Sequence, residues 1–164
     1  ELDAVFVTEL QRQNRFEIVP LTRAECDRRF HVPEFSSTGA LPHDFLAILQ
    51  RDYGADAVMF IDITVFKPYR PLALGVRGKL ATVGDDVRLL WTFDNVFSAT
   101  DERVANAARR HFLKSDRQGV PADFTQGVLQ SPTRFAAYVA SEMFGTLPPV
   151  YSPPKPAPAK EKGR

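Results

Sequence analysis

The chain has 164 residues, of which 44% are hydrophobic and 25% charged. These proportions are typical of one folded globular domain with a sizeable core, and no run of 18 or more apolar residues predicts a transmembrane helix. The formal net charge is +1, but residues 152–164 alone hold four Lys and Arg against one Glu. The remaining 17 cations and 19 acids (21 − 4 and 20 − 1) give the rest about −2, which argues against nucleic-acid binding.

The first third of the chain predicts helices separated by short breaks. Residues 1–13 place apolar side chains at helical spacing, and Phe16–Val19 alternates like a short strand that ends at Pro20. Thr22 and Glu25 match a capping box at the start of a helix over 22–30. Residues 31–41 predict a loop, and a helix then follows from Pro42 to the terminating Gly54.

Three consecutive β segments predict an antiparallel meander. They cover 57–66, 72–83 and 87–98. Alternate residues of each segment are apolar, so one face of the sheet is expected to lie on a core covered by helices. Gly84 and Asp85 suit a two-residue turn, which would pair Leu80 with Leu89 and Gly78 with Trp91. We therefore expect an α+β fold whose mixed or antiparallel sheet is packed by helices on one face.

The opposite face of this sheet is predicted to be polar, and solvated or partner-facing. It collects Asp62, Thr64, Arg77, Lys79, Arg88, Thr92 and Asp94, with Phe60 and Phe66 as apolar members. Asp62 and Asp94 are the one pair of acids suited to a hydrolase-type acid and base. Arg77 lies between them, however, and a cross-strand ion pair is the favoured interpretation.

The segment Lys67–Pro71 joins the first two strands and carries one aromatic residue and two cations. It is either a rigid hairpin tip or an exposed recognition loop, because Tyr and Arg are both favoured at interfaces. The residues predicted to contact a partner are Asp62, Phe66, Tyr69, Arg70 and Arg77.

The last third predicts a helix beginning at Thr100–Glu102, an irregular region over 116–131 with a helical turn near 124–129, and a final helix from Ser131 to Gly145. A single domain is expected over 1–147. The remainder, 148–164, is rich in Pro and Lys and is expected to be a disordered tail, with a polyproline ligand as the alternative.

No motif predicts catalysis, a metal or a cofactor. His31, His43 and His111 fall in three different elements, no glycine-rich phosphate loop occurs, and one cysteine cannot form an internal disulfide. For Cys26 a buried structural thiol is the favoured interpretation, with a reactive thiol or an intermolecular link as alternatives.

Three short motifs resemble a bacterial envelope domain. They are Phe16–Val19, the run from Tyr53 to Met59 that leads into a long strand, and Leu89–Thr92 at the end of a hairpin. Together, over about residues 1–115, the chain is similar to the N-terminal domain of TolB and to its relatives, the curli secretion lipoprotein CsgG and the penicillin-binding-protein activator LpoB.

This resemblance implies a periplasmic, non-enzymatic domain that acts in protein–protein binding or assembly, including self-association. It implies an outer-membrane lipoprotein whose only membrane contact is an upstream lipid anchor, and a first strand that precedes Glu1. The long insertions that build the curli pore are not evident, so an adaptor or assembly factor is expected rather than a pore. The alternatives are a small-ligand or nucleic-acid binding module and a hydrolase-type enzyme.

Overall fold

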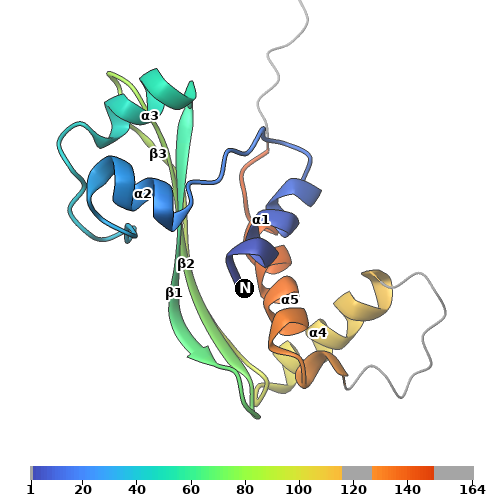
Figure 1. The fold of residues 1–164 in the computed structure, drawn as a ribbon. Coiled ribbons are helices and arrows are strands. Elements are labelled where there is room, and N and C mark those ends of the chain that lie inside the picture. The colour runs from blue at the N-terminus through green and yellow to red at the C-terminus, as the bar shows by residue number, and fades with distance from the viewer. Residues whose placement is uncertain (1, 116–126, 150–164) are drawn as a thin grey trace, which may run out of the picture.

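The computed structural model describes residues 2–115 and 127–149 and confirms the α+β fold with a three-stranded antiparallel meander (Figure 1). The strands, in the order β1-β2-β3, are β1 (Ala57–Lys67), β2 (Ala73–Thr82) and β3 (Leu89–Ser98). The helices are α1 (Leu2–Arg12), α2 (Arg23–Phe30), α3 (Phe45–Tyr53), α4 (Glu102–Ser115) and α5 (Pro132–Gly145). No helix among the described residues is long and apolar enough to cross a membrane.

The larger core lies between the sheet and the layer of α1, α4 and α5 (Figure 1). Phe6 and Leu10 of α1 and the buried stripe of α5 meet the inward side chains of β2 and β3 there. The indole of Trp91 lies over Gly78, where an added Cβ would come within 2.7 Å of the ring. Trp91 also donates from Nε1 to the Thr146 hydroxyl at 3.0 Å, which ties β3 to the end of α5.

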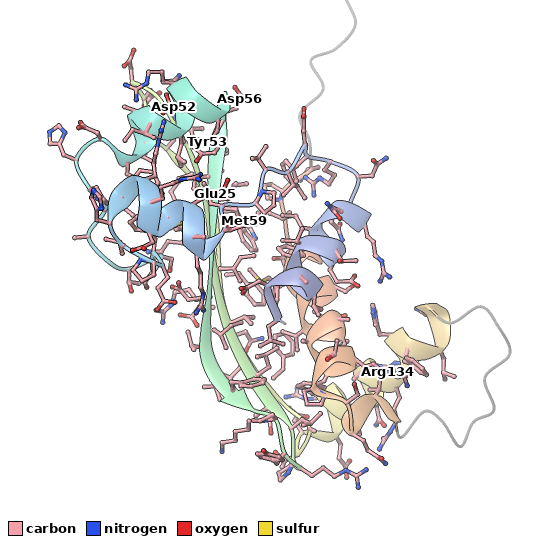
Figure 2. All side chains as sticks on the ribbon, in the orientation of Figure 1. Glu25, Asp52, Tyr53, Asp56, Met59 and Arg134 are labelled. Atoms are coloured by element: carbon pink, nitrogen blue, oxygen red, sulfur yellow. The ribbon has the colours of Figure 1, made fainter. Side chains whose placement is uncertain are left out.

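A second helical layer, α2 and α3, covers one end of the opposite face, where the sequence led us to expect no helix (Figure 1). Its smaller core contains Phe30, Phe45, Leu49 and Val83. The reason lies in β1, which is apolar on both faces: Met59 and Ile61 pack on the larger core, whereas Val58 and Phe60 pack on the smaller one. Asp52 of α3, labelled in Figure 2, pairs with Arg29 of α2.

Three predicted helix ends are confirmed, whereas α3 begins at Phe45 and not, as predicted, at Pro42. The Thr22 hydroxyl accepts from the Glu25 N–H at 3.2 Å, and the Glu25 carboxylate accepts from the Thr22 N–H at 2.9 Å, which completes the capping box of α2. Gly54 ends α3 in the left-handed conformation, with φ of 63°. The Ser131 hydroxyl caps α5, whose first residue is Pro132. Of the predicted turn near 124–129, a single short turn follows Gly127, and 124–126 lie outside the described residues.

The predicted strand at Phe16–Val19 is wrong, because this segment belongs to the connection that carries the chain from one face of the sheet to the other (Figure 1). Ile18 packs on the larger core and Leu21 on the smaller one. Within the described residues its backbone makes no hydrogen bond to a strand. The alternation of apolar residues therefore belongs here to a segment that crosses between the two faces of the sheet, and not to a strand paired with a neighbour.

The predicted pairing of β2 with β3 is wrong by two residues. Leu80 lies opposite Trp91, and Gly78 lies opposite Phe93. The turn is wider than expected: Thr82 N–H donates to the Arg88 carbonyl at 2.9 Å, and the Thr82 hydroxyl accepts from the Arg88 N–H at 2.7 Å. Because this shift is even, Trp91 and Phe93 keep their predicted face. The register shifts again at Leu90, however, so Leu89 lies opposite Ala81 on the other face, contrary to the prediction, and is 60% exposed.

A β-bulge at Thr64 changes which side chains of β1 share a face. Ile63 lies opposite Val76, but Val65 lies opposite Gly75, so one extra residue is accommodated on β1. Gly75 is needed there, because an added Cβ would come within 2.5 Å of the Thr64 hydroxyl oxygen. Beyond the bulge Phe66 lies opposite Leu74. It therefore lies on the face of the larger core and not on the predicted polar face.

Candidate functional site

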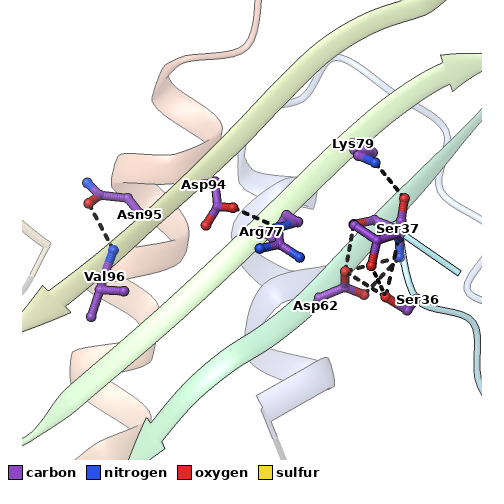
Figure 3. A network of polar contacts seen from close by, with 9 residues as sticks. Ser36, Ser37, Asp62, Arg77, Lys79, Asp94, Asn95 and Val96 are labelled. Carbon is purple, nitrogen blue, oxygen red and sulfur yellow. Dashed lines mark hydrogen bonds and ion pairs between the residues drawn. The ribbon is translucent and has the colours of Figure 1, made fainter.

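The predicted polar face is a row of charged side chains across the middle of the sheet (Figure 3). Asp62 of β1 lies opposite Arg77 of β2, and Arg77 lies opposite Asp94 of β3. Arg77 Nε donates to Asp94 Oδ2 at 2.7 Å. The favoured interpretation of a cross-strand ion pair is thus confirmed for Arg77 and Asp94.

Asp62 turns away from Arg77 and holds the loop that precedes α3 (Figure 3). Its Oδ2 accepts from the Ser37 N–H at 3.0 Å, from the Ser37 hydroxyl at 2.6 Å and from the Ser36 hydroxyl at 3.2 Å. Lys79 Nζ donates to the Ser37 carbonyl at 2.6 Å from the neighbouring strand. Ser36, Ser37, Asp62 and Lys79 therefore hold this loop against the sheet, and we call these four residues the clasp. Asp62 serves in the clasp as a hydrogen-bond acceptor.

The clasp borders an open depression with a volume of about 290 Å³. Thr38 of the loop lines one side, and residues of β2 and β3, including Arg77, Lys79, Thr92 and Asp94, line the other. Its lining carries two cations, Arg77 and Lys79, and one carboxylate, Asp94, whereas Asp62 lies outside the lining. Each of these carboxylates accepts hydrogen bonds from protein groups, so each is held by the fold in its present position.

The hairpin tip between β1 and β2 is the second predicted site, and it lies at one end of the sheet (Figure 1). Tyr69 is 84% exposed and Phe66 is 50% exposed. Arg70 is also exposed. Asp62 and Arg77 lie in mid-sheet on the other side of the bulge, so the five predicted contact residues form two separate groups.

The remaining candidate residues are scattered over the fold. His31 caps α2 in a left-handed conformation, the His43 side chain is 99% exposed, and the His111 ring lies 5.9 Å from that of Tyr138. Among the described residues no group of three or more His, Cys, Asp or Glu could hold a metal ion. Cys26 is buried, and its burial, followed by the nearby Glu25 carboxylate, raises the pKa of the thiol. A raised pKa disfavours the reactive thiolate at neutral pH.

Sequence reasoning missed Ser36, Ser37 and Lys79 as a unit. The serines lie in a loop without periodicity, and no local pattern tells which strand such a loop meets. One signal was present: Asp62 is an acid in the interior of a strand, where acids are depleted, so it required a polar partner.

Comparison of the chain with protein-family models, with curated proteins and with solved structures gives no match.

Proposed function

We propose that this chain is a non-enzymatic binding domain of the bacterial cell envelope, and that its contact surface is the β1–β2 hairpin tip. The observation that carries this proposal is the exposure of Tyr69, at 84%, beside the exposed Phe66 and Arg70. The exposed ring surface of Tyr69 and Phe66 would become more stable if a partner removed it from water. Aromatic side chains and Arg dominate the energetics of protein interfaces, and exposed apolar patches commonly mark them.

The tip is also well presented for binding. It connects β1 and β2, which pair along their length up to Lys67 and Ala73, and β3 pairs with β2 as far as Ala73. A tip held by a rigid sheet loses little conformational entropy when a partner buries it, and this preorganisation favours affinity. The envelope location comes from the resemblance to TolB, CsgG and LpoB, which also implies a periplasmic lipoprotein and a partner that is itself an envelope protein.

A second candidate function is small-ligand binding in the depression beside the clasp. The observation that favours it is the set of donors around this volume of about 290 Å³: the Thr38 and Thr92 hydroxyls, the Arg77 guanidinium and the Lys79 ammonium. A ligand there would sit on β2 and β3 and leave the hairpin tip free.

The test is affinity capture from cell-envelope extract, followed by measurement of the dissociation constant with the purified partner. The bait is the full chain, and the tip variant carries Tyr69→Ala and Arg70→Ala. A matched control variant, Arg88→Ala with Leu89→Ala, removes an exposed cation and an exposed apolar side chain at the other end of the sheet; Leu89 is 60% exposed.

We expect the tip variant to weaken binding by roughly tenfold or more, because buried aromatic and Arg contacts at interfaces are each worth more than about 1–2 kcal/mol. The control should bind as the unmodified chain does. A partner that binds the tip variant unchanged would refute the proposal for the hairpin. If the partner is instead lost in Lys79→Ala or Thr92→Ala, the depression is the site.

A further inference from the structure

Helix α4 carries an excess of positive charge on its solvent-exposed face. Its buried face contains Ala105 and Ala108, which are 6% and 0% exposed. The cations of the helix are Arg103, Arg109, Arg110 and Lys114; Arg103, Arg110 and Lys114 are exposed, whereas Arg109 is half-buried at the edge of the buried face, one turn after Ala105. Against these four stands one acid within the helix, Glu102, so the net charge of α4 is +3.

The described residues outside α4 carry a net negative charge. The described residues hold 16 Lys and Arg and 16 Asp and Glu. Removing α4 leaves 12 cations and 15 acids (16 − 4 and 16 − 1), a net charge of −3. Within the described residues the positive charge is therefore concentrated on α4, and such a distribution turns α4 toward an anionic surface.

The C-terminal half of α4 combines these cations with an exposed apolar side chain. Arg109 and Leu113 are one helical turn apart, as are Arg110 and Lys114, so the four side chains share one face. Leu113 is 49% exposed. Beside them, the guanidinium of Arg134, labelled on α5 in Figure 2, lies 4.8 Å from the centre of the Phe112 ring.

The local partners of these cations leave their charge largely uncompensated. Arg103 pairs with Asp101 at 3.3 Å, next to the start of the helix. Arg109 donates to the neutral Asn106 side chain at 3.0 Å. Within the part of the chain that the structure describes, Arg109, Arg110 and Lys114 form no ion pair.

We propose that this face of α4, formed by Arg109, Arg110, Leu113 and Lys114, binds the anionic headgroups of a phospholipid bilayer. The cations match a negatively charged surface, and Leu113 favours a bilayer over the alternatives. A nucleic-acid backbone offers phosphates but no environment for an exposed aliphatic side chain. The interface of a bilayer offers both, since cations lie among the headgroups while apolar side chains reach the acyl boundary.

The test is co-sedimentation of the full chain with vesicles of phosphatidylcholine, with and without phosphatidylglycerol, at low ionic strength. The α4 variant carries Arg109→Gln, Arg110→Gln and Lys114→Gln. Two matched variants remove three cations elsewhere: Arg23→Gln, Arg28→Gln and Arg51→Gln near α2 and α3, and Lys155→Gln, Lys160→Gln and Lys162→Gln in the C-terminal segment. A fourth variant, Leu113→Ser, keeps all the cations.

We expect binding only to the vesicles that contain phosphatidylglycerol, and a partition coefficient lowered roughly a hundredfold in the α4 variant, at about 1 kcal/mol for each cation near the surface. Leu113→Ser should lower it several-fold, and both matched variants should bind like the unmodified chain. Absence of binding to the anionic vesicles overturns the proposal, and so does an equal loss in either matched variant. Tighter binding to duplex DNA that Leu113→Ser leaves unchanged would identify a nucleic-acid surface instead.

Discussion

Gly78 of β2 lies against Trp91 of β3 and Met143 of α5, and there is no room at this position for a Cβ atom. A Cβ built at this position would come within 2.7 Å of the Trp91 ring and would overlap the Met143 methyl group. The absent side chain therefore allows the large indole to cover the sheet and the methionine of α5 to pack beside it. Gly145, at the end of α5, differs in that a Cβ there would have no neighbour within 4 Å.

The substitution Gly78→Ala is expected to lower the free energy of unfolding by about 1–3 kcal/mol, because overpacking forces Trp91 and Met143 out of their places. The matched substitution Gly145→Ala should leave it unchanged or raise it by up to about 1 kcal/mol, since Ala favours helix. Urea unfolding monitored by tryptophan fluorescence measures both. Equal effects of the two substitutions would mean that the contact of Trp91 with Gly78 is not tight.

Single residues also mark how far the sequence can predict this site. Alternation along the strands placed Asp62, Arg77 and Asp94 on one face, because the side-chain period of a strand is a local property. The partner of Asp62 was not predictable in this way. Ser37 is 25 positions away in a loop, and only the packing of α2 and α3 brings that loop over β1.

At the scale of elements, helix ends were predicted well because their signals are local. The capping box of Thr22 and Glu25 spans four residues and formed as its sequence indicates. The same local reasoning gave a wrong prediction for the β2–β3 turn, because Gly84 and Asp85 by themselves favour a tight two-residue turn. The outcome was decided by the Thr82 hydroxyl, which holds both the Asp86 carbonyl and the Arg88 N–H and so delays the strand to Leu89.

The substitution Thr22→Ala tests the cap of α2. Two hydrogen bonds from Thr22, first from its backbone N–H and then from its hydroxyl, hold the pKa of Glu25 below its ordinary value of 4.5. Removing the hydroxyl deletes the second bond and the acceptor for the Glu25 N–H. We expect the pKa of Glu25 to move up toward its ordinary value, and a loss of about 1 kcal/mol in the free energy of unfolding at neutral pH.

The sign of the pH dependence follows from the lowered pKa. Glu25 binds its proton less tightly in the folded state, so its contribution to stability is present above pH 4.5 and is lost as the pH falls through the folded value. NMR titration of the Glu25 carboxyl carbon in both proteins measures the pKa directly. An unchanged pKa in Thr22→Ala would show that the capping box does not hold the carboxylate in solution.

At the scale of the whole molecule, the sheet separates two cores of unequal size. Phe135 lies in the larger core with α5, and Phe45 lies in the smaller one with α2 and α3; they are 2% and 1% exposed. The sequence predicted the larger core from the alternation of β2 and β3. It did not predict the second layer, because the outward residues of β1 were interpreted as part of a polar face although Phe60 is among them.

The unequal cores predict unequal local stability. A layer of two short helices that rests on four buried side chains should open at a lower free energy than β2 and α5, which share the larger core. Phe45→Ala removes a ring at the centre of the smaller core, at a local cost of about 3–5 kcal/mol. Native-state hydrogen exchange should then show faster exchange of the α2 and α3 amides, while the β2 and α5 amides remain protected.

Phe135→Ala is the matched substitution in the larger core, and it should accelerate exchange in all elements, because every other part of the fold packs on the sheet that this core supports. If Phe45→Ala accelerates exchange in β2 and α5 as strongly as in α2 and α3, the two layers unfold as one cooperative unit. The clasp would then couple the two layers, since it joins the loop before α3 to the middle of the sheet. In the expected outcome the clasp opens together with the α2–α3 layer, and the depression beside it exists only while that layer is closed.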